Sequence, residues 1–333
     1  MTPGRPSLGK RVIQESILGR RGLVKTNTLW LALSVAASTG FAPKSAGPYF
    51  LILFSVFAWS QGSILANDIA DRSDDLFVGK KRWIQGIPLN AGVPIAILLP
   101  LAGLVAAFAA GSSFVTLFIY LFAVFFGYSY SLSPLRFKDR GGAGPLVYSL
   151  SGAFAFALLP IAWLGGLSLE TGLFIGFAVF LDKWINLHFH QVVDYGADRD
   201  RGIETLATTS GLERAKSSLR TLSTLSSILF PFLLVSLVWS LGKWTIPIYV
   251  GAFLLYFVGI GHFRRVRGLG KASALTRELP GCYLVGSFLL FRDLPLLLLF
   301  RLASIHSAMI SVVLVALFLI LLELHYSLHY RYD

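Results

Sequence analysis

Two acidic stretches hold the residues best suited to chemistry in this chain of 333 residues. One runs from Asn67 to Asp75, and the other begins with Asp194 and Asp198. Carboxylates that lie close together repel one another unless a cation joins them. Oxygen ligands without clustered Cys or His favour a hard divalent ion such as Mg²⁺, which commonly binds through one or two carboxylates and substrate phosphates.

In the first stretch, a continued helix would place Asp68, Asp71 and Asp75 on one face, with Asn67 beside Asp71. That arrangement predicts a cation site at a helix end. The alternative is a solvated acidic loop that binds nothing.

The second stretch predicts a polar face that extends into the preceding apolar run. Asp194 and Asp198 share a face by their four-residue spacing. Traced backwards, this face carries three more polar residues: His190, Asn186 and Asp182. Such a stripe should face a cavity or the bundle interior, because exposure to lipid is costly for polar groups. Alternatively, Asp182 and Lys183 only neutralise each other or their neighbours, and we expect His188 to be a packing donor and not a metal ligand.

A third stretch, Tyr130 to Lys138, supplies cations. Pro134 should end a helix there, and Arg136 and Lys138 follow it. Two such cations could bind a phosphate, but anchoring at the membrane surface explains them equally well. The same holds for Arg82, which follows the first acidic stretch.

The rest of the chain predicts a membrane protein of the all-α class. Hydrophobic residues make up 55% of the chain, charged residues 14%, and mean hydropathy is +0.69. Nine apolar runs are long enough to span a bilayer: 27–43, 48–66, 91–110, 114–132, 146–165, 171–193, 221–240, 244–262 and 304–325. A tenth run, 281–300, either spans or lies at the interface. We therefore expect one transmembrane domain over 27–325, with a basic arm at 1–26 and a tail at 326–333.

The charge distribution predicts the topology. Of the 29 Lys and Arg residues, 23 fall in the arm and in four loops that lie on one side if the spans alternate. This positive-inside pattern places the arm and both acidic stretches in the cytoplasm or its organellar equivalent. The net charge of +12 then needs no nucleic-acid partner. Cys282 is the only cysteine, which excludes an intrachain disulfide.

Acidic and basic clusters at one membrane face would form a trap for a diphosphate. Bridging Mg²⁺ and Lys or Arg side chains would draw charge from a leaving diphosphate, so that an allylic carbon–oxygen bond could ionise. The apolar interior would hold the lipid tail. Aromatic residues, 14% of the chain, could stabilise a carbocation, although most of them must serve packing.

At these residues the chain resembles the UbiA superfamily of intramembrane prenyltransferases, over roughly residues 25–325. The pattern N-D-x-x-D-x-x-x-D is met from Asn67 to Asp75, and Y-S-x-x-P-x-R-x-K from Tyr130 to Lys138. The pattern D-x-x-x-D followed by G-x-x-T-L is met from Asp194 to Leu206. Three matches in this order, each at the cytoplasmic end of an even-numbered span, make the resemblance specific.

The resemblance implies about nine transmembrane helices around a central cavity, and Mg²⁺-dependent transfer of a prenyl chain from a polyprenyl diphosphate. It assigns the metal complex to five residues: Asn67, Asp71, Asp75, Asp194 and Asp198. It places Arg136 and Lys138 on the diphosphate, with Asp68 and Tyr130 lining the same site. The family's Arg-Pro-Leu is replaced here by Ile87-Pro88-Leu89, and Arg82 could substitute for the missing arginine. Asp182, Asn186 and His190 match no general family motif and remain candidates for acceptor binding or deprotonation.

The acceptor itself is expected to be lipophilic, for example an aromatic quinone precursor. Phosphoribosyl transfer to a polyprenyl phosphate and cyclisation of the prenyl chain fit the same residues. From other classes, a membrane cation transporter and an inactive scaffold remain, but the loops on the opposite side lack the acids that an ion exit would need.

Overall fold

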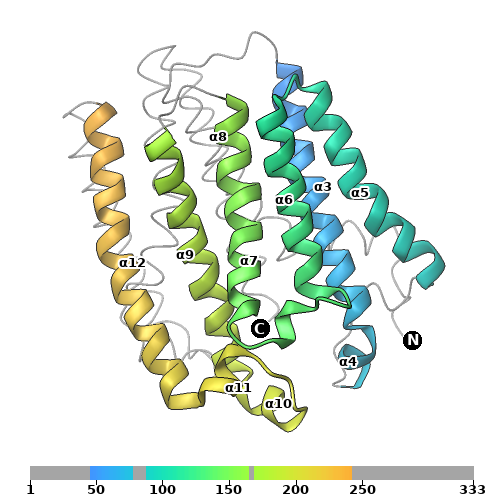
Figure 1. Cartoon of the computed structure of the whole chain (residues 1–333), viewed down its shortest axis with the longest axis vertical. Coiled ribbons are helices and arrows are strands. Elements are labelled where there is room, and N and C mark those ends of the chain that lie inside the picture. The colour runs from blue at the N-terminus through green and yellow to red at the C-terminus, as the bar shows by residue number, and fades with distance from the viewer. Residues whose placement is uncertain (1–45, 78–87, 165–168, 242–333) are drawn as a thin grey trace, which may run out of the picture.

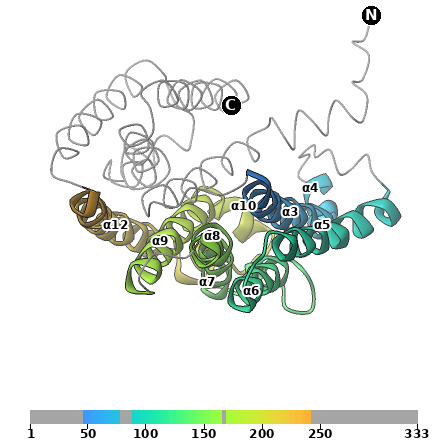
Figure 2. The ribbon, with the colours of Figure 1, turned by 90° about the horizontal axis from the view of Figure 1, so that it is seen from above.

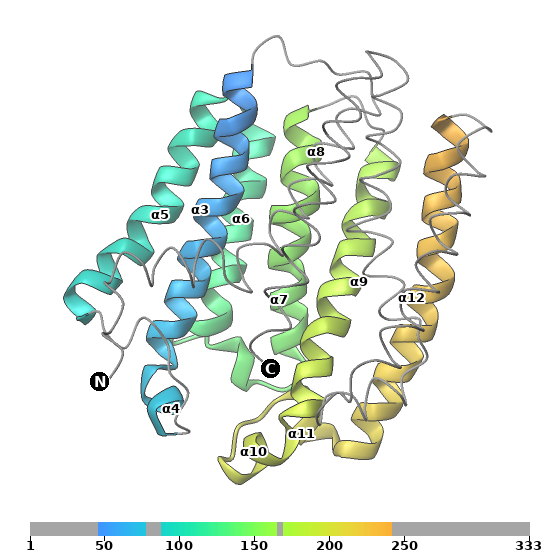
Figure 3. The same cartoon turned by 180° about the vertical axis from the view of Figure 1, so that it is seen from behind.

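A computed structural model describes residues 46–77, 88–164 and 169–241 of the chain. In these ranges the chain is helical and forms no strand. Figure 1 and Figure 3 show the long helices standing side by side, and Figure 2 shows them end-on as an arc that runs from α12 through α9 and α8 to α6 and α3. The all-α class is thereby confirmed for the described residues.

The long helices coincide with the apolar runs predicted from the sequence. They are α3 (Ala46–Ala70), α5 (Leu89–Ala109), α6 (Phe114–Ser131), α9 (Leu169–Val193) and α12 (Leu212–Leu241). One further span is built from α7 (Ala143–Ala153), the π-helical η4 (Phe154–Leu158) and α8 (Leu159–Leu164). Short helices follow several of them: α4 (Arg72–Phe77), the 3₁₀ turn η3 (Phe137–Asp139), α10 (Tyr195–Asp200) and α11 (Leu206–Ser210).

Four of these segments are long and apolar enough to cross a membrane: Leu89–Ala109, Phe114–Ser131, Ala143–Trp163 and Gly172–Val193. The predicted spans 27–43, 244–262 and 304–325, and the ambiguous run 281–300, lie outside the described residues. The arm 1–26 and the tail 326–333 also lie outside them, so the nine-helix count and these boundaries stay predictions.

Helix α5 places large apolar side chains outside and small ones inside. Leu98, Val105 and Phe108 are 61%, 66% and 71% exposed, whereas Ala96 and Ala107 are buried. In water this distribution would be unfavourable, but in a bilayer the outer side chains meet lipid tails and the small residues let helices approach closely. The pattern supports a membrane setting for this helix.

Tyrosine hydroxyls of α6 bind backbone carbonyls of α5 near a proline inside that helix. Pro100 has no backbone N–H, so the carbonyl of Ala96 one turn earlier loses its usual donor. The hydroxyl of Tyr128 on α6 donates to that carbonyl, and the Tyr120 hydroxyl donates to the carbonyl of Pro100 at 2.8 Å. Neighbouring helices thus satisfy polar backbone groups that lipid could not.

We expect Gly103→Leu to destabilise the protein. A Cβ atom at Gly103 would lie 3.0 Å from the backbone carbonyl oxygen of Ser55 and would also clash with the Tyr120 hydroxyl. Overpacking of this kind costs about 1–3 kcal/mol. The measurement is the thermal melting temperature in detergent. The matched control is Gly47→Leu, since no atom of the described residues lies within 4 Å of a Cβ there; equal melting temperatures for the two variants would contradict the packing argument.

Candidate functional site

The first acidic stretch sits at a break between two helices. Helix α3 ends at Ala70 and α4 begins at Arg72, so Asp71 lies between them. Hydrogen bonding still continues through the break, because the amide of Asp71 donates to Asn67 O at 2.9 Å and that of Asp75 donates to Asp71 O at 2.8 Å. The helical geometry that places Asp71 and Asp75 on one face therefore continues through the break, as the sequence predicted.

The second acidic stretch has the same construction. Helix α9 ends at Val193, α10 begins at Tyr195, and Asp194 lies between them. The amide of Asp194 donates to His190 O and that of Asp198 to Asp194 O, both at 2.9 Å. In both stretches the first aspartate of the D-x-x-x-D pattern thus joins a 25-residue helix to a six-residue helix. The two acidic stretches therefore share one local structure.

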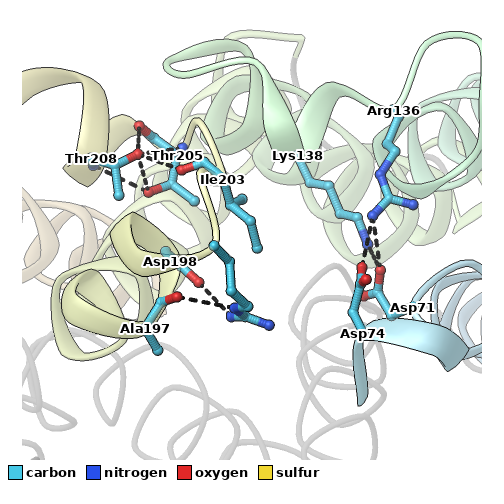
Figure 4. Close-up of polar contacts among 10 residues, drawn as sticks. Asp71, Asp74, Arg136, Lys138, Ala197, Asp198, Ile203, Thr205 and Thr208 are labelled. Atoms are coloured by element: carbon cyan, nitrogen blue, oxygen red, sulfur yellow. Dashed lines mark hydrogen bonds and ion pairs between the residues drawn. The ribbon is translucent and has the colours of Figure 1, made fainter. Parts of the chain in front are cut away.

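The loop after α6 brings two cations to the first stretch. Lys138 Nζ forms an ion pair with Asp71 Oδ1, and Arg136 Nη2 lies 3.4 Å from the same oxygen. Arg136 Nη2 also lies 3.3 Å from Asp74 Oδ2. Figure 4 shows both basic side chains pointing at the two carboxylates. Residues 67 positions apart in the chain thus meet at one point, which spacing within a motif cannot reveal.

Arg136 is constrained in both charge and backbone. Partial burial lowers the pKa of its guanidinium, but the hydrogen bond to Asp139 and three neighbouring carboxylates outweigh burial and hold the pKa above its ordinary value. The residue stays cationic at any physiological pH. Its backbone has φ 33° and ψ 56°, in the left-handed region. Such a conformation costs about 1–3 kcal/mol in a residue with a side chain and persists where the surroundings enforce it.

The far end of the same loop pairs with the segment that follows the second stretch. The amide of Gly141 donates to Glu204 O at 2.7 Å, and Gly141 forms an isolated parallel bridge with Thr205. Gly202 turns that segment with φ 68°. One loop therefore touches the first acidic stretch through side chains and the region after the second stretch through its backbone.

Thr205, the threonine of the G-x-x-T-L pattern, caps a helix. It is the N-cap of α11: its hydroxyl accepts from the Thr208 amide at 3.2 Å, and the Thr208 hydroxyl lies 2.8 Å from the Thr205 amide that donates to it. Reciprocal capping satisfies amides that the first turn of a helix leaves without partners. Threonine in this pattern has a structural role in this chain.

The second stretch carries its own counter-ion. Arg201 Nη2 donates to Asp198 Oδ1 at 2.9 Å, while Arg201 Nε donates to Ala197 O at 3.0 Å. Figures 1 and 3 place α4, α10 and α11 at the same end of the bundle. Tyr130, near the same end of α6, packs its ring against Tyr148 of α7 with the ring centres 5.5 Å apart. The prediction that both stretches share one end of the bundle is confirmed.

Along α9, the predicted polar stripe changes from buried to exposed toward Asp194. Asp182 is 2% exposed, Asn186 is half-buried and His190 is exposed. Asp182 Oδ2 pairs with Lys183 Nζ at 3.3 Å, which is the mutual neutralisation that the sequence left open. The ammonium of Lys183 lies 5.4 Å from the centre of the Phe156 ring in η4.

Other predicted residues have structural contacts. Asn67 Oδ1 accepts from the Ser131 hydroxyl at 2.9 Å, Asp68 and Asp75 are buried, and His188 Nε2 lies 3.1 Å from Ala215 O, as expected for a packing contact. Arg82 lies outside the described residues.

Sequence reasoning assigned no role to Asp74 and Asp139, which hold Arg136: Asp74 occupies a variable position of the first pattern, and Asp139 lies just beyond the pattern that ends at Lys138. The three-residue spacing of Arg136 and Asp139 was a usable signal, had a helical turn been expected after Pro134. Within the part of the chain that the structure describes, no three His, Cys, Asp or Glu side chains lie close enough together to hold a metal ion by themselves.

The family model of the UbiA prenyltransferase family matches residues 28–276. The chain belongs to this family. The match spans both acidic stretches and the basic loop between them, and the family is one of integral membrane prenyltransferases. No curated protein sequence matches the chain.

Several solved structures share the fold. A UbiA homologue from Archaeoglobus fulgidus bound to GPP and Mg²⁺ is 21% identical, with a TM-score of 0.57, 87% of this chain and 99% of that chain covered. A structure described for digeranylgeranylglyceryl phosphate synthase is 18% identical, with a TM-score of 0.59 and coverage of 86% and 99%. The apo structure of a UbiA homologue from Aeropyrum pernix K1 is 16% identical, with a TM-score of 0.55 and coverage of 84% and 97%.

We expect Thr205→Val to loosen α11. The substitution keeps the shape of the side chain but removes the capping oxygen, which should cost about 1 kcal/mol. Hydrogen exchange at residues 206–210 is the measurement, because it reports local opening. Thr224→Val on the exposed face of α12 is the control. Unchanged exchange in Thr205→Val would refute the capping role.

Proposed function

We propose that this protein transfers a prenyl group from a polyprenyl diphosphate to a lipophilic acceptor, with Mg²⁺ as cofactor. The observation that carries the proposal is the loop from Leu132 to Gly142. It sets Arg136 and Lys138 against the first acidic stretch and pairs through Gly141 with the segment after the second. Cations and carboxylates are thus assembled where a diphosphate and its metal ion would need them.

The acidic stretches suit Mg²⁺. By motif position, the ligands would be Asn67, Asp71, Asp75, Asp194 and Asp198. Because no three such side chains lie together among the described residues, substrate phosphates and water would complete the coordination of an ion that commonly binds through one or two carboxylates. When bound, Mg²⁺ would neutralise charge on the leaving diphosphate. The homologue from Archaeoglobus fulgidus binds GPP and DMAPP with Mg²⁺, which supports this assignment.

The basic side chains have a separate task. Arg136 and Lys138 would contact the diphosphate and stabilise the negative charge that grows as the allylic carbon–oxygen bond breaks. Both are partly buried, with side-chain exposures of 32% and 11%, and charge interactions are stronger there than in open water. Arg82 would add to this cluster, and Tyr130 would line the site between the two acidic stretches.

The acceptor would reach the site along α9. Asn186 and His190 lie on the face that ends in Asp194, and their exposure increases toward it. They could bind the polar group of an aromatic acceptor such as a quinone precursor. The same site would also serve phosphoribosyl transfer to a polyprenyl phosphate or prenyl cyclisation, and dependence on the acceptor distinguishes prenyl transfer from cyclisation.

A cation transporter is less well supported. An ion path needs acids along its length, but both acidic stretches lie at one end of the described bundle. The buried Asp182 has Lys183 as a counter-ion, which would repel a passing cation. We place the protein in a membrane with several spans and with this end in the cytoplasm or the organellar equivalent, where the positive-inside pattern puts it.

We expect Asp71→Asn and Asp194→Asn each to lower prenyl transfer by about 100-fold or more, because each removes a charge that balances the metal complex. The measurement is Mg²⁺-dependent release of diphosphate from labelled geranylgeranyl diphosphate by purified protein. Glu170→Gln, at the opposite end of α9, should keep full activity. Retained activity in both aspartate variants would rule out the metal assignment.

Acceptor dependence gives a second test. A transferase should release diphosphate faster when a lipophilic aromatic acceptor is added, and mass spectrometry should find the prenylated acceptor. Release without any acceptor, with a cyclic hydrocarbon product, would favour cyclisation. Complete inertness toward allylic diphosphates would exclude the proposed function.

A further inference from the structure

Asp139 lies beside the proposed site but belongs to none of the matched patterns. It is the last residue of η3, three residues after Arg136, and its Oδ2 accepts a hydrogen bond from Arg136 Nε. We propose that Asp139 is a positioning residue that orients the Arg136 guanidinium toward the diphosphate, with Asp74 as a second support. This inference rests on the proposed function, in which Arg136 contacts the diphosphate.

The guanidinium of Arg136 is held on all of its nitrogens. Nε donates to Asp139, Nη1 donates to Ala70 O at 3.3 Å, and Nη2 lies 3.3 Å from Asp74 Oδ2. A guanidinium is planar, and its donors have a fixed geometry. Fixing the Nε edge and one Nη group therefore fixes the plane in which the remaining N–H groups point.

Lys138 is held in a different way. Its ammonium group pairs with Asp71, and the proposed function assigns Asp71 to the metal ion. Asp139 and Asp74 are assigned to no ligand, so Arg136 keeps these two supports whatever Asp71 binds. Arg136 is thereby prepared for binding in advance, and a group that is already oriented loses less freedom when its ligand arrives.

Asp139 also closes the turn that gives Arg136 its backbone conformation. The amide of Asp139 donates to Arg136 O at 3.2 Å, while the amide of Arg136 donates to Leu132 O at 2.7 Å. The left-handed backbone of Arg136 is thus held from both sides along the chain, and its side chain is tied to the same aspartate. Asp139 therefore contacts both the backbone and the guanidinium of Arg136.

The test measures binding of inorganic diphosphate with Mg²⁺ to the full-length protein in detergent by calorimetry. This probe needs no knowledge of the prenyl chain or acceptor. Asp139→Asn should bind about tenfold more weakly, as expected when a charge-assisted contact that orients the ligand-binding group is lost. The matched control is Glu213→Gln, which disrupts another i,i+3 pair, with Lys216 at 3.3 Å, on a glutamate whose side chain is 82% exposed. Its affinity should equal that of the wild type.

A double-mutant cycle separates positioning from a general structural effect. If Asp139 acts through Arg136, Asp139→Asn should weaken binding no further in an Arg136→Ala background. Asp139→Glu keeps the charge and moves it by one methylene, so it should show intermediate affinity with an unchanged melting temperature. It also carries the test if Asp139→Asn does not fold.

Wild-type affinity for diphosphate in either Asp139 variant would overturn the inference. So would an equal loss of affinity when Asp139→Asn is added to the Arg136→Ala variant. Failure of the proposed function would look different, since the wild type itself would then bind no Mg²⁺-diphosphate and release none from an allylic substrate.

Discussion

The charge balance at one end of the bundle is the constraint on which the site depends. Carboxylates placed where membrane helices end repel one another and are costly to bury without counter-ions. In this protein, Lys138 and Arg136 supply the counter-charge to the first acidic stretch, and Arg201 supplies it to Asp198. The basic loop thus helps the acids to stay close together, and under the proposed function the same cations would meet the anionic substrate.

Helix packing makes this balance possible, because it brings the ends of α3, α6 and α9 to one level. Small residues on the inner faces, such as Gly103 and Ala107, permit close contact, and tyrosine hydroxyls satisfy the carbonyls near Pro100. Where lipid offers no hydrogen bonds, such contacts must come from the protein itself. The positions of the acidic stretches therefore follow from packing deep in the bundle.

The two acidic stretches have the same local structure but different surroundings. Each first aspartate joins a long helix to a short one, yet the counter-ions of Asp71 come from a distant loop, whereas that of Asp198 comes from its own stretch. Under the proposed function, metal or substrate binding at the first stretch would rearrange contacts between separate segments, whereas at the second stretch the rearrangement would be local.

Local sequence patterns determined the helices, the geometry of the acidic stretches and the end of the bundle where both stretches lie. The apolar runs predicted the described long helices, the four-residue spacing predicted the continued helical geometry through Asp71 and Asp194, and the charge bias predicted that both stretches share one end. These features depend on residues that are near neighbours along the chain and on how each segment interacts with the membrane. They can therefore be predicted from the sequence without knowing the tertiary structure. The tertiary structure decided which cation meets which acid. Arg136 meets Asp74 and Gly141 meets Glu204 because a turn after α6 folds back between two helix ends, and such long-range pairing depends on packing that no spacing rule encodes.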